Sequence, residues 1–195
     1  MKKIIMFLMA SVLLLGATSC TSCNGEKQKM ETMVEQTVKS DRAYMCDNYG
    51  CIYRYYETQL VLNEYLDEEG CTGTVDSVTN VFQIVYEYED GGYNPIVVIF
   101  GHSTDAFTVK EVEGPWLEDE DMSGENIAIT YRQAYERMMQ SNYPKPHSRN
   151  CTLRKEVGLY DCNPQYIFGN VDEQLYVDAK TGSVSDKSPA FNPIK

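Results

Sequence analysis

The sequence has few of the residues that most enzymes use, and the first shortage is of histidine. Only His102 and His147 are present to act as bases near neutral pH. His102 stands in the run Gly101–Asp105, which gathers His, Ser and Asp, but the members of a catalytic triad converge from separate segments of a chain. The sequence also has no glycine-rich phosphate loop and no His-Glu-x-x-His motif. It therefore predicts a protein that is not an enzyme, with no catalytic residue and no cofactor.

Basic residues are also few, with 17 Lys and Arg against 29 Asp and Glu, and the formal charge is −12. A strongly acidic chain repels nucleic acid and anionic lipid, because both carry negative charge. Nucleic acid is therefore excluded as an expected partner. The same charge favours solubility, cationic ligands or divalent ions.

A calcium site is the nearest match to a metal motif. Asp119, Asp121, Ser123 and Gly124 resemble the opening positions of a calcium-binding loop. The twelfth position of such a loop should be a bidentate Glu, and here it is Thr130. We therefore expect no metal at this loop.

The amino-terminal residues have the pattern of an export signal. A basic start is followed by an apolar run from Ile4 to Leu15 and by small residues that lead directly into Cys20. The run is shorter than the roughly 20 residues that span a bilayer, and no other apolar run in the sequence comes close to that length. The segment resembles a bacterial lipoprotein signal, which implies a signal peptide over 1–19, lipid on Cys20 and a polar tether over 20–28. The alternative is an ordinary secreted protein cleaved nearby.

The chain has seven cysteines, and in an exported protein cysteines are expected to form disulfides. Six remain if Cys20 carries lipid, and their connectivity is open, because six thiols allow about 15 pairings. Cys46 and Cys51 flank a short turn-like segment, and Cys151 and Cys162 flank an expected hairpin, so each pair is a candidate disulfide. Thiolate zinc sites need paired short-spaced ligands, which these cysteines do not supply.

The first half, 29–113, reads as one helix followed by strands. Met30, Met33, Val34 and Val38 recur at helical spacing, which predicts a helix over about 29–44. Apolar alternation and apolar runs then predict strands at about 52–66, 78–88, 96–100 and 107–112. We expect an antiparallel meander with the helix on one face.

The second half, 126–184, starts after a Gly-, Pro- and acid-rich boundary. Thr130 and Gln133 form a capping-box sequence, so we expect a helix from Thr130 that ends by Tyr143, before two prolines. Strands are expected at about 151–157, 165–170 and 175–178. In the turn after them, Asp178 can accept hydrogen bonds from the amides two residues on, and Gly182 can adopt the left-handed conformation.

These elements resemble the PepSY domain. The similarity rests on Ile127 and Ile129-Thr130 before the helix, Ala134 inside it, and the run Tyr176–Val184, with its Tyr-Val-Asp-Ala-x-Thr-Gly-x-Val pattern. It implies an α+β fold in the cell envelope, a non-catalytic role and, in some members, inhibition or chaperoning of peptidases. Because the first half has the same order of helix and strands, the architecture predicted is a helix packed on an antiparallel sheet, with two tandem PepSY-like units as an option and 185–195 as a tail.

The sequence favours an envelope lipoprotein that acts as a non-catalytic binding module, held to a membrane by its lipid and either periplasmic or surface-exposed. A protein partner such as a peptidase follows from the resemblance. The alternative is a surface interaction lipoprotein that binds a glycan or peptide through its 15 tyrosines. Lys145, His147 and Arg149 form a small basic group in an acidic chain, and we expect them as partner contacts or, otherwise, as a solvated loop.

Overall fold

The computed structural model describes residues 22–87, 93–117, 119–156 and 162–189, with side chains from Met33 onward. The expected signal segment and Cys20 lie outside the described residues. The elements, in chain order, are α1 (Ser22–Tyr49), β1 (Arg54–Leu62), β2 (Val75–Glu87), β3 (Tyr93–Ser103), β4 (Phe107–Glu113), α2 (Tyr131–Gln140), β5 (Asn150–Arg154), β6 (Gln165–Asn170), β7 (Glu173–Asp178) and β8 (Val184–Ser185).

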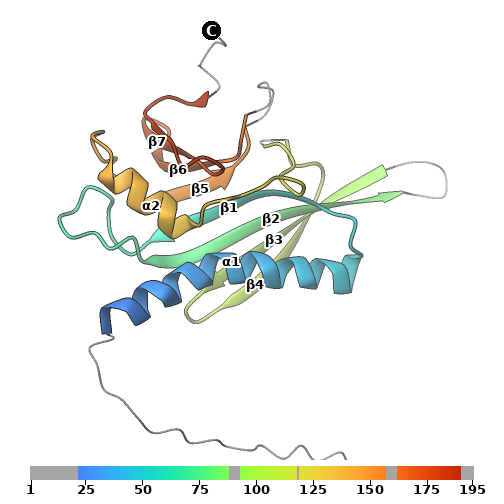
Figure 1. Cartoon of the computed structure of the whole chain (residues 1–195). Helices are drawn as coiled ribbons and strands as arrows, with labels where there is room; N and C mark the ends of the chain where they lie inside the picture. Colours follow the sequence, from blue (N-terminus) through green and yellow to red (C-terminus); the bar gives the residue numbers. More distant parts are fainter. Residues whose placement is uncertain (1–21, 88–92, 118, 157–161, 190–195) are drawn as a thin grey trace, which may run out of the picture.

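All eight strands belong to one antiparallel sheet in the order β4-β3-β2-β1-β5-β6-β7-β8 (Figure 1). The first strands of the two halves, β1 and β5, pair directly from Glu57–Arg154 to Val61–Asn150. Each would be an exposed edge in a separate half, with unpaired N–H and C=O groups. Their pairing removes both edges and makes the halves continuous.

The prediction of a helix-on-sheet α+β fold, with two tandem units as an option, is wrong. One eight-stranded sheet dominates the described residues, and two helices accompany it, so the fold is richer in β-structure than that prediction. The strand positions themselves are close to those expected. The error lies in the assembly, because local periodicity identifies strands but does not state which edges pair.

Both helices pack on the same face of the sheet (Figure 1). One side of α1 points toward the core, and its residues recur at helical spacing: Val34, Val38, Asp41 and Met45. The buried side of α2 is formed in the same way, by Tyr131, Ala134, Tyr135 and Met138. A single apolar core joins these side chains to the inward-facing residues of the sheet, among them Leu60, Phe82, Phe100, Leu153 and Phe168. Among the described residues no helix lies on the opposite face of the sheet, which we call the helix-free face.

Local signals near the second helix are confirmed. The side chain of Thr130 accepts a hydrogen bond from Gln133 N, and the Gln133 side chain accepts one from Thr130 N, so the capping box is present. Asp178 Oδ1 accepts hydrogen bonds from the amides of Lys180 at 2.9 Å and Thr181 at 2.7 Å. Gly182 has a φ of +74°, as the turn requires.

The first helix is longer than expected. It begins at Ser22, inside the segment expected to be a tether, and ends at Tyr49 rather than near Tyr44. Within the described part of the chain, no helix has the length and apolar character needed to cross a membrane.

Candidate binding groove

A row of side chains crosses the helix-free face from one edge of the sheet to the other. The strand register places one residue from each strand in line, and we call this set the cross-sheet row: Thr108, Gly101, Thr79, Gln59, Thr152, Ile167, Tyr176 and Ser185. Neighbouring strands lie about 4.8 Å apart, so the row is roughly 34 Å long. Most of its members carry a hydroxyl or an amide, and none carries a formal charge.

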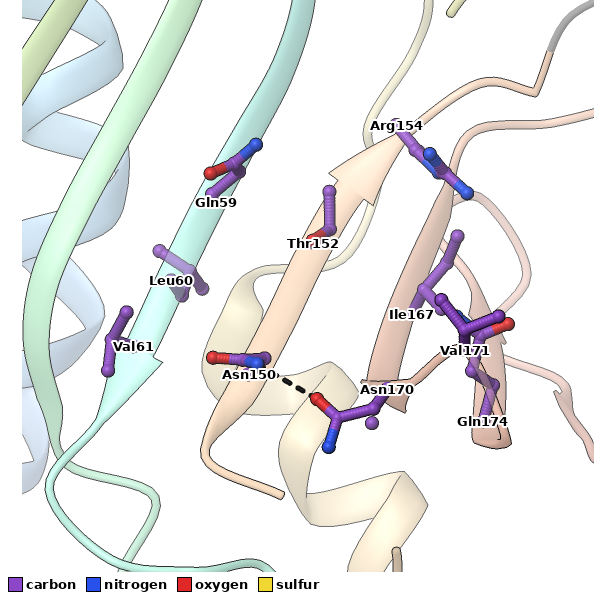
Figure 2. A pocket seen from close by; sticks show the side chains of 11 residues that line it. Gln59, Leu60, Val61, Asn150, Thr152, Arg154, Ile167, Asn170, Val171 and Gln174 are labelled. Carbon is purple, nitrogen blue, oxygen red and sulfur yellow. Dashed lines mark hydrogen bonds between the residues drawn. The ribbon is translucent and has the colours of Figure 1, made fainter. Parts of the chain in front are cut away.

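The centre of this row is hollowed into a groove of about 390 Å³. Figure 2 shows Gln59, Thr152 and Ile167 on neighbouring strands along its floor. Its remaining lining includes Val61, Asn150, Arg154, Gly169, Asn170, Val171 and Gln174. One hydrogen bond within the lining runs from Asn150 Nδ2 to Asn170 Oδ1, at 2.9 Å (Figure 2). Val171, at the β6–β7 turn, is 92% exposed.

Two smaller hollows continue the groove along the same face. One, of about 180 Å³, lies among Ser77, Thr79, Gly101, Ser103 and Thr108 on β2, β3 and β4. The other, of about 340 Å³, lies beside Tyr176 and is bounded by Asp186–Ser188. Gly101 makes room for the first hollow, because a Cβ there would lie 2.6 Å from Thr108 Oγ1.

A loop after β4 covers the neighbouring part of this face. Trp116 packs against a small cluster of Tyr56, Val81 and Val97. Its backbone N–H donates to Gln83 Oε1 at 2.7 Å, and its indole N–H donates to Asp119 Oδ2 at 3.1 Å. Trp116 therefore closes the edge of a core, and the groove remains open beside it.

The charge beside the groove is balanced within the protein. Arg154 lies 3.5 Å from Asp119 and 3.6 Å from Glu156, measured between guanidinium nitrogen and carboxylate oxygen. These pairs leave the groove lined mainly by neutral amides, hydroxyls and apolar groups, although the whole chain carries −12.

The three basic residues expected at a partner surface make contacts within the protein. Lys145 Nζ donates to the carbonyls of Ser141 at 2.9 Å and Tyr143 at 2.8 Å, at the end of α2. Arg149 Nε donates to Leu62 O at 2.6 Å. His147 stacks on a tyrosine ring and lies 3.0 Å from an Asp67 oxygen. Their side chains hold the end of α2 and the start of β5 against the loop after β1.

His102 is not part of a local triad but of a polar chain on the helix-covered face. Its Nε2 lies 2.9 and 3.0 Å from the two carboxylate oxygens of Asp41, which is 1% exposed. Asp41 also accepts a hydrogen bond from Asn80 Nδ2 at 2.7 Å, and Thr58 then links Asn80 to the hydroxyl of Tyr55. Burial raises the pKa of the Asp41 carboxyl, against the hydrogen bonds from Asn80 and His102, which lower it. The arrangement joins α1 to the sheet.

The structure contains one of the two disulfides that were candidates from the sequence. Cys46 and Cys51 form a disulfide with their Cα atoms 4.2 Å apart, at the end of α1. Cys151 and Cys162 both have free thiols. Cys151 lies opposite Phe168 at one end of the β5–β6 hairpin, whereas Cys162 precedes Gln165, which pairs with Arg154 at the other end. The two thiols therefore do not face each other.

In the acidic loop that contains Asp119 and Asp121, a carboxylate accepts hydrogen bonds from backbone amides. Asp121 Oδ1 accepts hydrogen bonds from the amides of Tyr55 at 3.0 Å and Ser123 at 2.9 Å. Among the described residues, no group of three or more His, Cys, Asp and Glu side chains is placed to hold a metal ion.

The groove residues were not predicted from the sequence. Gln59, Thr152 and Gln174 occupy the outward positions of strands that were correctly located, so the alternation of side chains was the available signal. This alternation alone does not predict the groove, because the groove forms only when β1 pairs with β5.

Comparisons with models of protein families, with curated proteins and with solved structures gave no match.

Proposed function

We propose that the protein is a non-catalytic binding module of the cell envelope, and that its ligand site is the groove on the helix-free face of the sheet. The observation that carries this proposal is the open groove of about 390 Å³ at the centre of the cross-sheet row. A sheet face without helices leaves side chains available to a partner. The neighbouring coverings, at Trp116 and at Asp186–Ser188, leave this part of the face accessible.

The lining supports a polypeptide ligand. Amide side chains such as Gln59, Asn150 and Gln174 can each donate and accept, so they match the N–H and C=O groups of a peptide backbone. Val61 and the exposed Val171 add apolar contact area. The one charged side chain among the described residues of the lining, Arg154, is paired with Asp119 and Glu156, which favours a neutral segment over a charged one.

The sequence supports the proposed place of action and the proposed class of partner. The apolar run before Cys20 supports export and lipid attachment, and the similarity to PepSY domains supports a peptidase that the module inhibits or chaperones. A glycan is the second candidate, favoured by Tyr176, which lies in the same row as Gln59 and whose hydroxyl donates to Gln174 Oε1 at 2.5 Å.

The test is a pull-down from envelope extract with the lipid-free chain starting at Thr21. Thr152→Arg places a long charged side chain in the groove, and Thr104→Arg makes the same change at an exposed turn outside it. We expect the wild type and Thr104→Arg to retain a protein that Thr152→Arg loses. Equal retention by all three forms would exclude the groove, and recovery of a glycan alone would support the second candidate.

Lipid attachment is tested separately in the full-length protein. We expect Cys20→Ser to move the protein from the membrane fraction to the soluble fraction and to abolish incorporation of labelled palmitate. Cys23→Ser is the matched control and should behave as the wild type. Incorporation of label into Cys20→Ser at the wild-type level would overturn the anchor.

A further inference from the structure

A second cavity, of about 370 Å³, lies on the other face of the same central strands. Its floor is the cross-strand set Thr58, Leu153 and Tyr166, on β1, β5 and β6. One wall is α1 and the other is the segment from Glu125 to Thr130. The cavity therefore lies where the two halves of the chain meet, between the helix of the first half and the approach to α2.

Most of this cavity is apolar. Val34 and Val38 line it from α1, Ile127 and Ile129 from the opposite wall, and Leu153 from the floor. Its volume falls within the range of about 300–1,000 Å³ that is typical of small-molecule sites. The lining therefore suits a ligand with an apolar body.

Arg42 brings a positive charge to this lining. Its Nε is buried, and among the described residues no hydrogen-bond acceptor reaches it. The guanidinium lies over the ring of Tyr55, with its carbon 5.2 Å from the ring centroid. Buried polar groups in proteins are nearly always hydrogen-bonded, so a buried N–H without a protein partner at a cavity wall points to an acceptor supplied from outside.

The acids around the cavity have contacts of their own. Glu35 Oε1 accepts a hydrogen bond from Tyr131 N, at 3.4 Å, at the first residue of α2. Glu125 Oε1 lies 2.6 Å from Lys155 Nζ. The hydroxyl of Tyr166 donates to Ile129 O at 3.1 Å. Both acids are thus engaged in contacts between the elements that form the cavity.

We propose that this cavity binds a small carboxylic acid with an aliphatic tail, with the carboxylate on Arg42. A planar guanidinium binds carboxylates by charge-assisted hydrogen bonds, often in a two-point arrangement. From Arg42, the side chains of Val38 and Val34 continue along the same side of α1 for roughly 12 Å, at 1.5 Å per residue. The tail lies along this stripe, against Ile127 and Ile129. The site is independent of the groove on the other face.

Octanoate is the probe. The matched control compound is 1-octanol, which has a chain of the same length but no carboxylate. We expect titration calorimetry to show saturable octanoate binding, with 1-octanol at least about tenfold weaker, because a hydrogen bond to a charged group contributes more than one tenfold step in affinity. NMR shifts should be centred on Ile127, Ala128 and Leu153.

Variants separate the site from non-specific uptake. Arg42→Met should weaken octanoate binding by about tenfold or more. Lys39→Met removes an exposed cation from the same helix and should leave binding unchanged. Val38→Phe keeps Arg42 but fills the cavity, and should abolish binding of both ligands. Thr104→Arg, at an exposed turn outside both sites, should bind octanoate as the wild type does.

Several results would overturn the proposal. These are no saturable binding of octanoate, equal affinity for octanoate and 1-octanol, or equal affinity of Arg42→Met and Lys39→Met. Retained binding in Val38→Phe would place the ligand elsewhere. Circular dichroism of each variant shows whether it is still folded. If a variant that loses binding is unfolded, the ratio of the wild-type affinities for octanoate and 1-octanol decides whether the carboxylate is recognised.

Discussion

At the residue scale, the best-defined polar groups in this protein hold structure rather than perform chemistry. Asp178 Oδ2 accepts a hydrogen bond from Asn163 Nδ2 at 2.9 Å, while its Oδ1 binds two backbone amides of the following turn. Burial alone would raise the pKa of this carboxyl, but the hydrogen bonds from Asn163, Thr181 and Lys180 outweigh it and lower the pKa. The charged form of Asp178 is therefore the form that stabilises the turn.

Replacing this carboxylate should have a pH-dependent cost. We expect Asp178→Ala to lower the free energy of unfolding by about 1–2 kcal/mol at pH 7, as for the loss of a capping side chain. Because the folded-state pKa lies below the ordinary value of 3.8, the wild-type advantage is present above that pH and disappears as the pH falls through the folded-state pKa. Urea titrations at several pH values measure this difference. Asp172→Ala, at an exposed position, is the control and should show neither effect.

Asp41 is the second residue whose removal is informative, since it is buried between His102 and Asn80. We expect Asp41→Ala to lower the free energy of unfolding by about 1–3 kcal/mol, because Asn80 Nδ2 then loses its shorter hydrogen bond and keeps only the one to Thr37 Oγ1 at 3.4 Å. Asp105→Ala, on an exposed turn, should change it by less than about 0.5 kcal/mol. Equal stability of the two variants would show that the Asp41 contacts contribute no net stability.

At the element scale, what the sequence predicted well was local. The capping box at Thr130 and Gln133 is a short-range pattern, and the structure confirms it. The strand expected at 52–66 is present as β1, although it is shorter, at Arg54–Leu62. β8 was missed because a strand of two residues has no periodicity to detect. Asp41 was missed as a core residue because a charged side chain interrupts the apolar stripe of α1.

The cap also gives a prediction for α2. We expect Thr130→Ala to lower the free energy of unfolding by about 1 kcal/mol, because the N–H of Gln133 loses the hydroxyl that accepts its hydrogen bond. Thermal unfolding followed by circular dichroism measures the change. Thr104→Ala, which removes the same hydroxyl at an exposed turn, should unfold at the wild-type temperature. A wild-type melting temperature for Thr130→Ala would mean that α2 is held by packing alone.

At the scale of the whole molecule, the pairing of β1 with β5 has the widest consequences. It turns two runs of four strands into one sheet, and it places Gln59 beside Thr152 on one face and Thr58 beside Leu153 on the other. The groove and the helix-side cavity both depend on these neighbours. Neither could be predicted from the sequence, because their residues come from both halves and only the long-range pairing brings them together.

One sheet and one core predict that the two halves unfold together. Leu60 on β1 is 1% exposed and lies at this junction, between Val78 on β2 and Cys151 on β5. We expect Leu60→Ala to lower the free energy of unfolding by about 2–5 kcal/mol, the usual cost of truncating a buried leucine. Native-state hydrogen exchange should show the same loss for amides of β2 and of β6, although the substitution lies in the first half. Val171→Ala, at a 92% exposed side chain, should leave both sets unchanged. A loss confined to β1–β4, with β6 still protected, would mean that the halves fold independently and that the β1–β5 junction contributes little to the stability of the sheet.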